Sequence, residues 1–365
     1  MDRLSYLTHS AINAHFTKNN KDFVVSEIPL YEFTGEGEHL ILKIRKKDMT
    51  TWDMLKKLGD VTGVKMRDFG YAGLKDKDGM TVQNISMPKK LEHKLENFTH
   101  PQIKILERTY HKNKLKTGHL KGNRFFIRLK KVNPTDAQKL KRVLKTLKKE
   151  GFPNYFGYQR FGRDGDNFER GRDILEGKVK ERNKKMRNFF ISAYQSHLFN
   201  IWLSKRIEIS RLFASFDEKE LFDLFNFPKE VIKQMKTQPN FFKILPGETM
   251  HHYPHGRVFI CEDIDAESQR FADRDITVAG LLPGHKTSVS TGLAGNYEKD
   301  ITKECEAFCE KMNGTRRFAW IWAEDIESTY KEDEAWFEFS FSLPKGSYAT
   351  VFLEMLTHIN FQKKS

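Results

Sequence analysis

The sequence predicts an α+β fold in which an inserted middle segment interrupts the first domain. Strand-like segments with alternating apolar residues come first, amphipathic helices lie between them, and a strand–loop–helix pattern returns near the C-terminus. The chain of 365 residues is long enough for two domains and can bury a core without disulfides. We therefore predict one discontinuous domain, formed by residues 1–177 and 316–365, and an inserted domain at 178–315.

The N-terminal elements are a strand and a helix. Apolar side chains alternate with charged ones within residues 36–48, which is the two-residue period of a strand: Leu40, Leu42 and Ile44. Thr50 and Asp53 then have the spacing of a capping box, and the apolar residues around them share one helical face: Trp52, Leu55 and Leu58. A Thr-Val-Gln run that begins at Thr81 is typical of the next strand.

Residues 122–132 are typical of another strand, and an amphipathic helix follows it. Thr135 and Gln138 predict a capping box, Gly151 predicts the end, and the buried stripe contains Leu140, Val143, Leu144 and Leu147. The opposite face is basic and carries Lys139, Lys141, Arg142, Lys145, Lys148 and Lys149. This face fits a solvated surface or a contact with an RNA backbone, and the sequence leaves both open.

A segment rich in glycine and aromatic residues follows at 152–167 and has the composition of a long functional loop. Helices are predicted at 170–177 and 186–207, and strand-like pieces at 257–263 and 275–282. The middle of the chain also holds a histidine cluster, His251, His252 and His255. No nearby carboxylate or cysteine completes a metal site with these histidines, so a polar loop is the better interpretation.

Composition indicates a nucleic-acid partner and a reducing compartment. Lysine and arginine number 63 against 49 acidic residues, which gives a net charge of +14 and favours a polyanionic partner. Cys261, Cys305 and Cys309 form no paired framework, and Cys305 with Cys309 is a weak zinc pattern. The N-terminus lacks a secretory signal pattern, and no apolar run reaches the length of a membrane span. We expect a cytoplasmic protein.

The segment Gly70–Gln83, GYAGLKDKDGMTVQ, places lysines and aspartates on a loop flanked by glycines. Aspartate and glycine supply ordinary turn chemistry, so this segment could be a surface turn. A second segment, Gly280–Ser288, nearly spells a phosphate-binding P-loop. It has three residues between its glycines where that loop needs four, and His285 stands directly before Lys286.

Five segments taken together resemble the TruD family of tRNA pseudouridine synthases, in the order in which that family has them. They are KDFVVSEIP with GEGEHL, AGLKDKDGMTVQ, PNYFGYQRFG, SAYQSHLFN and LPKGSYATVFLE, and the resemblance covers nearly the whole chain. The sequence departs from the family at Tyr158 and at Asp78-Gly79. The resemblance implies a pseudouridine synthase catalytic domain with a mixed, largely antiparallel sheet, plus the family's inserted α/β domain.

The same resemblance implies a set of site residues. The aspartate directly after the motif lysine is catalytic in the family, which makes it Asp76 here, whereas sequence physics alone could not choose between Asp76 and Asp78. A basic residue near the N-terminus accompanies it, with Lys18 as the best match and Lys21 as the rival. Phenylalanine stacks on the flipped base at Phe156, and the other substrate-binding positions correspond to Asn154, Phe23 and Tyr348. Core packing is the alternative for each aromatic residue.

The implied activity is isomerisation of uridine to pseudouridine, at uridine 13 in the D arm of tRNA. It requires no metal and no cofactor, and we expect tRNA as partner, no membrane association and a monomer. The main alternative is a non-catalytic RNA-binding or RNA-chaperone protein on the same fold, which the intact Lys75-Asp76 pair opposes. A more distant alternative is an RNA-dependent NTPase that uses Gly280–Thr287.

Overall fold

The computed structural model of the chain describes residues 3–162 and 164–361. The chain divides into two compact units, each assembled from separate segments. We call the first the sheet unit, Ile12–Lys148 with Ala323–Ala349, and the second the helix unit, Met1–Ala11, Lys149–Trp322 and Thr350–Ser365. The predicted inserted domain at 178–315 falls largely within the helix unit, and its boundaries stay a prediction.

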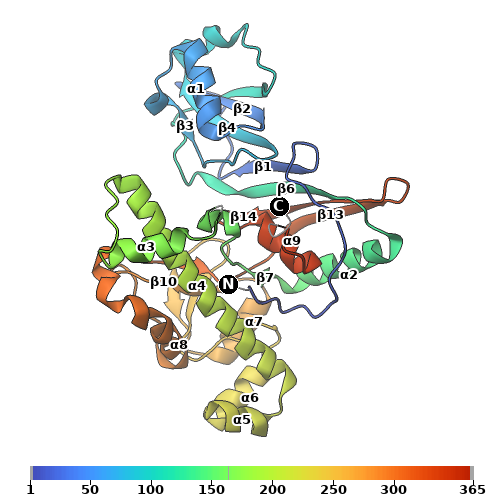
Figure 1. Cartoon of the computed structure of the whole chain (residues 1–365), viewed down its shortest axis with the longest axis vertical. Helices are drawn as coiled ribbons and strands as arrows, with labels where there is room; N and C mark the ends of the chain where they lie inside the picture. The colour runs from blue at the N-terminus through green and yellow to red at the C-terminus, as the bar shows by residue number, and fades with distance from the viewer. Residues whose placement is uncertain (1–2, 163, 362–365) are drawn as a thin grey trace. The chain divides into compact units, whose positions relative to one another are not determined.

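The sheet unit is built on one mixed sheet (Figure 1), with the strand order β13-β14-β6-β1-β4-β2-β5 and β3 added on β4. Only β1 and β4 run parallel, and every other described pair is antiparallel, which confirms the predicted mixed, largely antiparallel sheet of an α+β protein. The strands are β1 (Phe23–Pro29), β2 (His39–Lys47), β3 (Gly70–Tyr71), β4 (Met80–Pro88), β5 (Ile103–His111), β6 (Leu120–Leu129), β13 (Glu324–Lys331) and β14 (Trp336–Pro344).

Helix α1 (Thr51–Thr62) covers one end of this sheet and carries the predicted capping box of Thr50 and Asp53. Leu55 and Leu58 are fully buried, and they pack with Leu40, Leu42 and Ile44 of β2 in one core cluster. Trp52 is 45% exposed and contacts Tyr71 edge-on, so its predicted place on the buried face was wrong. Met54 occupies that face in its place, because Met54 lies one turn before Leu58.

Helix α2 (Pro134–Glu150) buries the predicted stripe of leucines and valine. Its N-terminal cap differs from the prediction of Thr135 and Gln138. The Asn133 side chain accepts a hydrogen bond from the backbone N–H of Asp136 at 2.8 Å and donates to the Asp136 carboxylate at 2.9 Å. The helix begins at Pro134, where a fixed φ suits the first helical position, and this makes Asn133 the capping residue. Short 3₁₀ helices at Met66–Asp68 and Lys89–Leu95 complete the unit.

The helix unit surrounds the long helix α4 (Lys184–Ser215), which contains the predicted helix at 186–207. Its small sheet has the order β11-β10-β8-β9, and a two-stranded sheet joins β7 and β12. These strands are β7 (Phe152–Pro153), β8 (Thr249–His252), β9 (Val258–Ile260), β10 (Ile276–Leu282), β11 (Thr315–Phe318) and β12 (Trp320–Ile321). The remaining helices are α3 (Asn167–Leu175), α5 (Glu218–Phe225), α6 (Lys229–Thr237), α7 (Ile264–Ala272), α8 (Gly292–Thr302) and α9 (Ala349–Thr357), with 3₁₀ helices at Tyr158–Phe161 and Lys303–Lys311.

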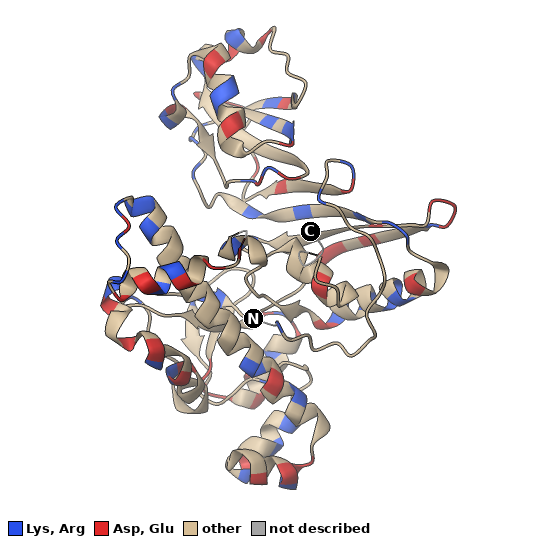
Figure 2. Ribbon diagram, viewed as in Figure 1, with Lys and Arg blue, Asp and Glu red and all other residues tan. Residues whose placement is uncertain are grey.

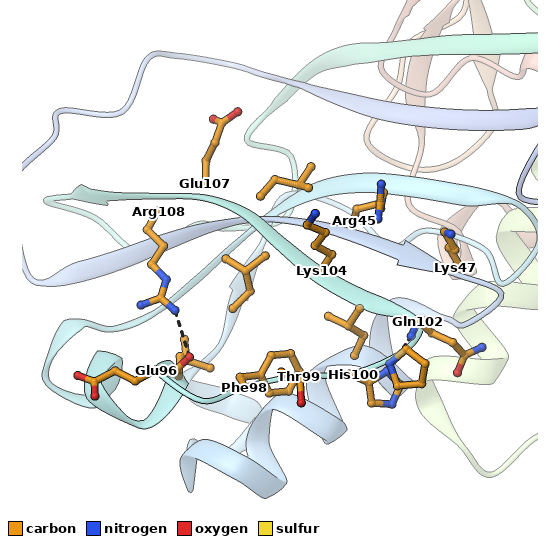
Figure 3. A pocket seen from close by; sticks show the side chains of 15 residues that line it. Arg45, Lys47, Glu96, Phe98, Thr99, His100, Gln102, Lys104, Glu107 and Arg108 are labelled. Atoms are coloured by element: carbon orange, nitrogen blue, oxygen red, sulfur yellow. Dashed lines mark hydrogen bonds between the residues drawn. The ribbon is translucent and has the colours of Figure 1, made fainter.

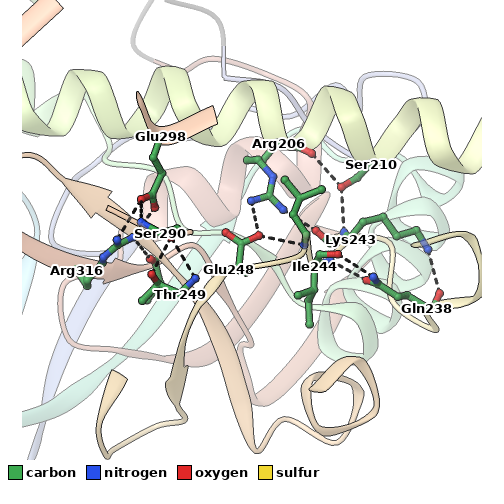
Figure 4. A network of polar contacts seen from close by, with 12 residues as sticks. Arg206, Ser210, Gln238, Lys243, Ile244, Glu248, Thr249, Ser290, Glu298 and Arg316 are labelled. Carbon is green, nitrogen blue, oxygen red and sulfur yellow. Dashed lines mark hydrogen bonds and ion pairs between the residues drawn. The ribbon is translucent and has the colours of Figure 1, made fainter. Parts of the chain in front are cut away.

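A buried polar network ties α4 to the loops beneath it in the helix unit (Figure 4). The Arg206 guanidinium pairs with the Glu248 carboxylate at 2.6 Å and donates to the Lys243 carbonyl, also at 2.6 Å. The Lys243 ammonium donates to two carbonyl oxygens, those of Gln238 at 3.0 Å and Asn240 at 2.9 Å. These bonds offset part of the cost of burying the charged groups, although Arg206 Nε and one Glu248 oxygen have no hydrogen-bond partner among the described residues.

Within the described residues, none of the helices combines the length and apolar character needed to cross a membrane.

Candidate active site

The parallel pair of strands brings two predicted site segments to one edge of the sheet. Strand β1 starts at Phe23 and β4 starts at Met80, and Val24 lies opposite Met80 in the register. Because the two strands run in the same direction, the chain that precedes each of them reaches the same edge. The segment that contains Lys18 precedes β1, and the loop that contains Asp76 precedes β4.

The backbone of the Asp76 loop is held from below by side chains of the sheet unit. Lys46, whose whole residue is only 1% exposed, donates from its ammonium to the Asp76 carbonyl at 2.9 Å and to the Met49 carbonyl at 2.6 Å. The Thr51 hydroxyl accepts a hydrogen bond from the backbone N–H of Lys75 at 2.9 Å and donates to Gln83. These bonds fix the backbone on both sides of the Lys75–Asp76 peptide bond.

Lys75 and Asp76, although adjacent, have opposite environments. The Lys75 ammonium pairs with the buried Glu27 carboxylate at 3.2 Å and donates to the Asn123 side-chain oxygen at 2.7 Å. The second oxygen of Glu27 accepts from the backbone N–H of Asn84 at 2.9 Å. Asp76 is exposed, as is Asp78. The loop therefore anchors its lysine to the sheet and presents the Asp76 carboxylate at the surface.

Burial shifts the pKa values of the groups that hold this loop. The pKa of Lys46 is lowered to about 8, chiefly by desolvation, while the charge of Asp76 raises it and that of Lys75 lowers it. Desolvation raises the pKa of Glu27, and the neighbouring Lys75 ammonium partly offsets that rise. The anchoring charges are thus partly desolvated, which strengthens each hydrogen bond between them.

Lys18 is within electrostatic reach of the two loop aspartates, whereas Lys21 is exposed on the preceding turn. Desolvation lowers the pKa of Lys18, and the charges of Asp76 and Asp78 raise it, so the ammonium lies within electrostatic reach of both carboxylates. Lys21 is exposed on a turn in which Asn19 accepts from the backbone N–H groups of Lys21 and Asp22, each at 2.9 Å. Lys18 is thus the lysine with electrostatic influence from Asp76, and its role as the basic partner stays a prediction.

The backbone at Gly79, the last residue of the loop, requires a glycine. Its φ is +91°, and a Cβ atom there would lie 2.7 Å from the Phe23 carbonyl oxygen and 3.0 Å from the Phe23 ring. Glycine is the residue that tolerates both the positive φ and the close approach. Phe23 itself is buried, at 8% exposure, and its ring stacks on Phe125 with centroids 6.3 Å apart. Its role toward substrate stays a prediction, since these contacts are those of a core residue.

The predicted residues of the aromatic loop, Asn154 and Phe156, belong to the helix unit, and Arg317 joins them. The Arg317 guanidinium lies 3.9 Å from the centroid of the Phe156 ring. It also donates to the Asn154 side-chain oxygen at 2.9 Å, while the Asn154 amide donates to the Phe318 carbonyl at 2.9 Å. Both predicted residues are buried, with Phe156 at 9% exposure. One arginine thus orients the ring and the carboxamide together.

The structure therefore places the predicted residues in two groups. Lys18, Phe23 and Asp76 lie in the sheet unit, together with Tyr348, which is half-buried on the turn between β14 and α9. Asn154 and Phe156 lie in the helix unit. Among the described residues, no three or more His, Cys, Asp or Glu gather where they could hold a metal ion.

Sequence reasoning missed Lys46, Glu27, Thr51 and Arg317. One signal for Lys46 was available, because it continues the inward-facing positions Leu40, Leu42 and Ile44 of β2. A lysine at an inward position of a strand indicates a buried partner, which here is the backbone of the Asp76 loop. No comparable pattern marks Arg317, whose partners are about 160 residues away in the chain.

Comparisons with known proteins agree along nearly the whole chain. Residues 1–184 and 180–355 match the family described as tRNA pseudouridine synthase D (TruD). A protein of that name from Nitratiruptor is 55% identical over 98% of both chains. The protein of the same name from Campylobacter jejuni (strain 81116) is 56% identical over 97% of this chain and 95% of that one.

A crystal structure of a Methanosarcina mazei protein, provisionally assigned as tRNA pseudouridine synthase D, has a similar fold. The TM-score is 0.71, and the similarity covers 98% of this chain and 96% of that one. The two sequences are 21% identical, so this comparison concerns the fold alone. It confirms the predicted α+β architecture.

Proposed function

This chain belongs to the tRNA pseudouridine synthase D (TruD) family of isomerases, and on that premise we propose that it converts uridine 13 in the D arm of tRNA to pseudouridine, with Asp76 as the catalytic carboxylate. The observation that carries the proposal is the loop of Asp76. Its backbone is fixed by Lys46 and Thr51, its lysine is turned inward to Glu27, and its carboxylate is left exposed beside Lys18.

The reaction explains why a fixed, ionised carboxylate is needed. The C1′–N1 bond breaks, the uracil turns over, C5 bonds to C1′, and the proton lost from C5 is balanced by one gained at N1. Asp76 acts by attack at C1′, by addition at C6 or by removal of a ribose proton, and each route uses the charged form. The Lys18 ammonium, which lies within electrostatic reach of Asp76, attracts the phosphate that accompanies the uridine.

The remaining predicted residues bind the uridine once it has left its stack. Loss of base stacking is offset when an aromatic ring takes the place of the neighbouring base. We assign that ring to Phe156, the hydrogen bonds to Asn154, and further contacts to Phe23 and Tyr348. The Arg317 guanidinium supports this assignment for Phe156 and Asn154, because it holds both side chains in one arrangement.

We further propose that the enzyme acts as a monomer in the cytoplasm. The free cysteines Cys261, Cys305 and Cys309 support a reducing compartment, and the excess of basic residues supports tRNA as the partner.

Release of tritium from tRNA labelled at uridine C5 tests the activity, because C5 loses its hydrogen only when the new bond to C1′ forms. Purified protein should release tritium from unmodified tRNA and should yield pseudouridine at position 13. A map of pseudouridine in tRNA from cells with and without the protein tests the position. Binding of tRNA without tritium release would favour the RNA-chaperone alternative and overturn the proposal.

A further inference from the structure

A groove of about 460 Å³ runs along β5, the edge strand of the sheet unit (Figure 3). Arg45 and Lys47 of β2 and Lys104 of β5 line it, together with His100 and Gln102. None of these three cations forms an ion pair within the described part of the chain. In Figure 2, further Lys and Arg lie on this end of the sheet unit near α1, interspersed with Asp and Glu.

The acidic residues around the groove do not neutralise these cations. Glu107 points away from it, and its carboxylate pairs with Lys43 at 2.7 Å. Arg108 also lines the groove, but its guanidinium donates to the Leu95 carbonyl and lies 3.6 Å from the Glu92 carboxylate. Glu96 also lines the groove, and among the described residues its carboxylate forms no ion pair with these cations. Arg45, Lys47 and Lys104 therefore leave an excess of positive charge in the groove.

The register of the sheet sets two of the cations side by side. Arg45 and Lys104 are directly opposite each other in the antiparallel pair of β2 and β5. Like charges at directly opposite positions destabilise a sheet. An anion between the two side chains would remove this repulsion, which points to a ligand with negative charge.

The strand that carries two of the groove cations is hydrogen-bonded to the end of the Asp76 loop. Lys47, at its end, lies opposite Met80, the first residue of β4, and the backbone N–H of Asp48 donates to the Gly79 carbonyl at 3.2 Å. Lys46, which holds the Asp76 carbonyl, lies between Arg45 and Lys47 in the sequence and faces the other side of the sheet. Lys47 is therefore the groove cation that lies nearest in the sheet to the end of the Asp76 loop.

We propose that this groove binds the phosphodiester backbone of the tRNA substrate next to the modified uridine, through Arg45, Lys47 and Lys104. The proposal rests on the proposed function for its choice of RNA as the anion. Arginine and lysine side chains bind phosphates without reading sequence, so the groove positions the RNA and adds affinity for any tRNA that fits the site.

The test compares three forms of the full chain that differ in charge. The groove variant combines Arg45→Gln, Lys47→Gln and Lys104→Gln. A matched control combines Lys219→Gln, Lys229→Gln and Lys233→Gln on α5 and α6, and so removes the same charge from exposed positions outside the groove. Lys43→Gln is a near control on the same strand, at a lysine that is already paired.

The measurement is the dissociation constant for unmodified tRNA at several salt concentrations. Each lost phosphate contact lowers the slope of log Kd against log salt by roughly 0.7–0.9, so the groove variant should lose about 2–3 of that slope and bind about tenfold more weakly near 0.15 M salt. Both controls should keep the slope of the unmodified protein. Melting temperatures of all three variants establish that each is folded.

An unchanged slope in the groove variant, or an equal loss in the α5–α6 control, overturns the proposal. The second result would mean that overall charge, and not this groove, attracts the RNA. Failure here is distinguishable from failure of the proposed function. If the unmodified protein releases tritium but the slopes agree, only the groove is refuted, and if it binds tRNA without releasing tritium, the slopes still report on the groove.

Discussion

Lys46 in the sheet unit and Lys243 in the helix unit are the same structural device in two places. Both are almost fully buried, at 1% and 7% exposure, and both donate to two backbone carbonyl oxygens. Desolvation lowers the pKa of each to about 8. Each lysine therefore ties together loop segments whose carbonyl groups would otherwise be unsatisfied.

The two lysines differ in what the tied loop carries. The carbonyls bound by Lys243 belong to Gln238 and Asn240, within a buried network that includes Arg206 and Glu248 (Figure 4). One carbonyl bound by Lys46 belongs to Asp76, whose side chain is exposed. The comparison teaches that burial and hydrogen bonding alone do not separate a structural lysine from a positioning one. The two kinds of lysine differ in whether the loop that they hold carries an exposed functional side chain, as the Asp76 loop does.

The largest effect should come from Asp76, because it is the proposed catalytic carboxylate and Lys46 only positions it. We expect Asp76→Asn to abolish turnover while tRNA affinity stays within roughly tenfold, about 1.4 kcal/mol, since the change keeps volume and removes only the charge. Tritium release and tRNA binding measure the two quantities. Asp78→Asn is the control and should be close to neutral. Equal loss in both variants would mean that the wrong aspartate was assigned.

The second effect compares the two lysines directly. Lys46→Met should lower kcat by about a hundredfold, because a displacement of the Asp76 backbone by about 1 Å is enough for such a loss. Lys243→Met should leave kcat within a few-fold. It should lower the free energy of unfolding by about 1–3 kcal/mol, since buried carbonyl oxygens lose their hydrogen-bond donor. Single-turnover rates and urea unfolding give the two readouts. Similar kcat values in both variants would mean that Lys46 does not position Asp76 for catalysis.

The third effect concerns Phe156 and asks whether the helix unit contributes to chemistry. If the ring stacks on uracil, Phe156→Ala should lose about 1–3 kcal/mol of stacking, or roughly ten- to a hundredfold in the catalytic step. Phe156→Tyr should keep substantial activity. A packing residue would instead lose about 3–5 kcal/mol of stability as alanine. A large fall in the melting temperature of Phe156→Ala would therefore support packing against Arg317 and Phe199.

The fourth effect separates the two candidate lysines near the N-terminus. Lys18→Met should reduce turnover by about tenfold, because it removes a positive charge that lies within electrostatic reach of Asp76 and attracts the phosphate of the substrate. Lys21→Met should have little effect, since Lys21 is exposed on the preceding turn. Steady-state tritium release on both variants is sufficient. The reverse order of effects would transfer the role to Lys21.

The smallest effect is a pH dependence that only one of the two lysines should impose on activity. With a pKa of about 8, Lys46 loses its charge above that pH, and turnover should fall there by a few-fold. The free energy of unfolding, in contrast, should rise over the same pH range. Between about pH 8 and the ordinary lysine value the folded state binds fewer protons than the unfolded state, so these two lysines make unfolding less favourable as pH rises.

The variants assign this pH dependence. Lys243→Met should retain the alkaline fall in turnover, because Lys46 is intact, whereas Lys46→Met should lack it. Both variants should show a smaller rise of unfolding free energy with pH than the unmodified protein. A fall in turnover that persists in Lys46→Met would assign it to another group, such as Lys18, whose pKa is also lowered by desolvation.

Local patterns were sufficient for several elements of the fold. The capping box of Thr50 and Asp53 and the buried stripe of α2 need only contacts within one or two helical turns, so the sequence contains them completely. Where the local prediction was wrong, a neighbouring residue fitted the same structural role better. Asn133 with Pro134 was a better start for α2 than Thr135, and Met54 was a better inward residue than Trp52.

In the candidate site, too, some features follow from local sequence and others from the tertiary structure. The Lys75-Asp76 motif and its glycine are local, and the sequence alone determined that a loop of this chemistry exists between α1 and β4. Only the tertiary structure decided which way each side chain faces, because that follows from the parallel pairing of β1 with β4, which joins segments more than fifty residues apart. This pairing brings Lys18 to Asp76 and Glu27 to Lys75, and the register of β2 turns Lys46 inward beneath them. Register depends on the packing of the whole sheet against its core, and no short stretch of sequence specifies it.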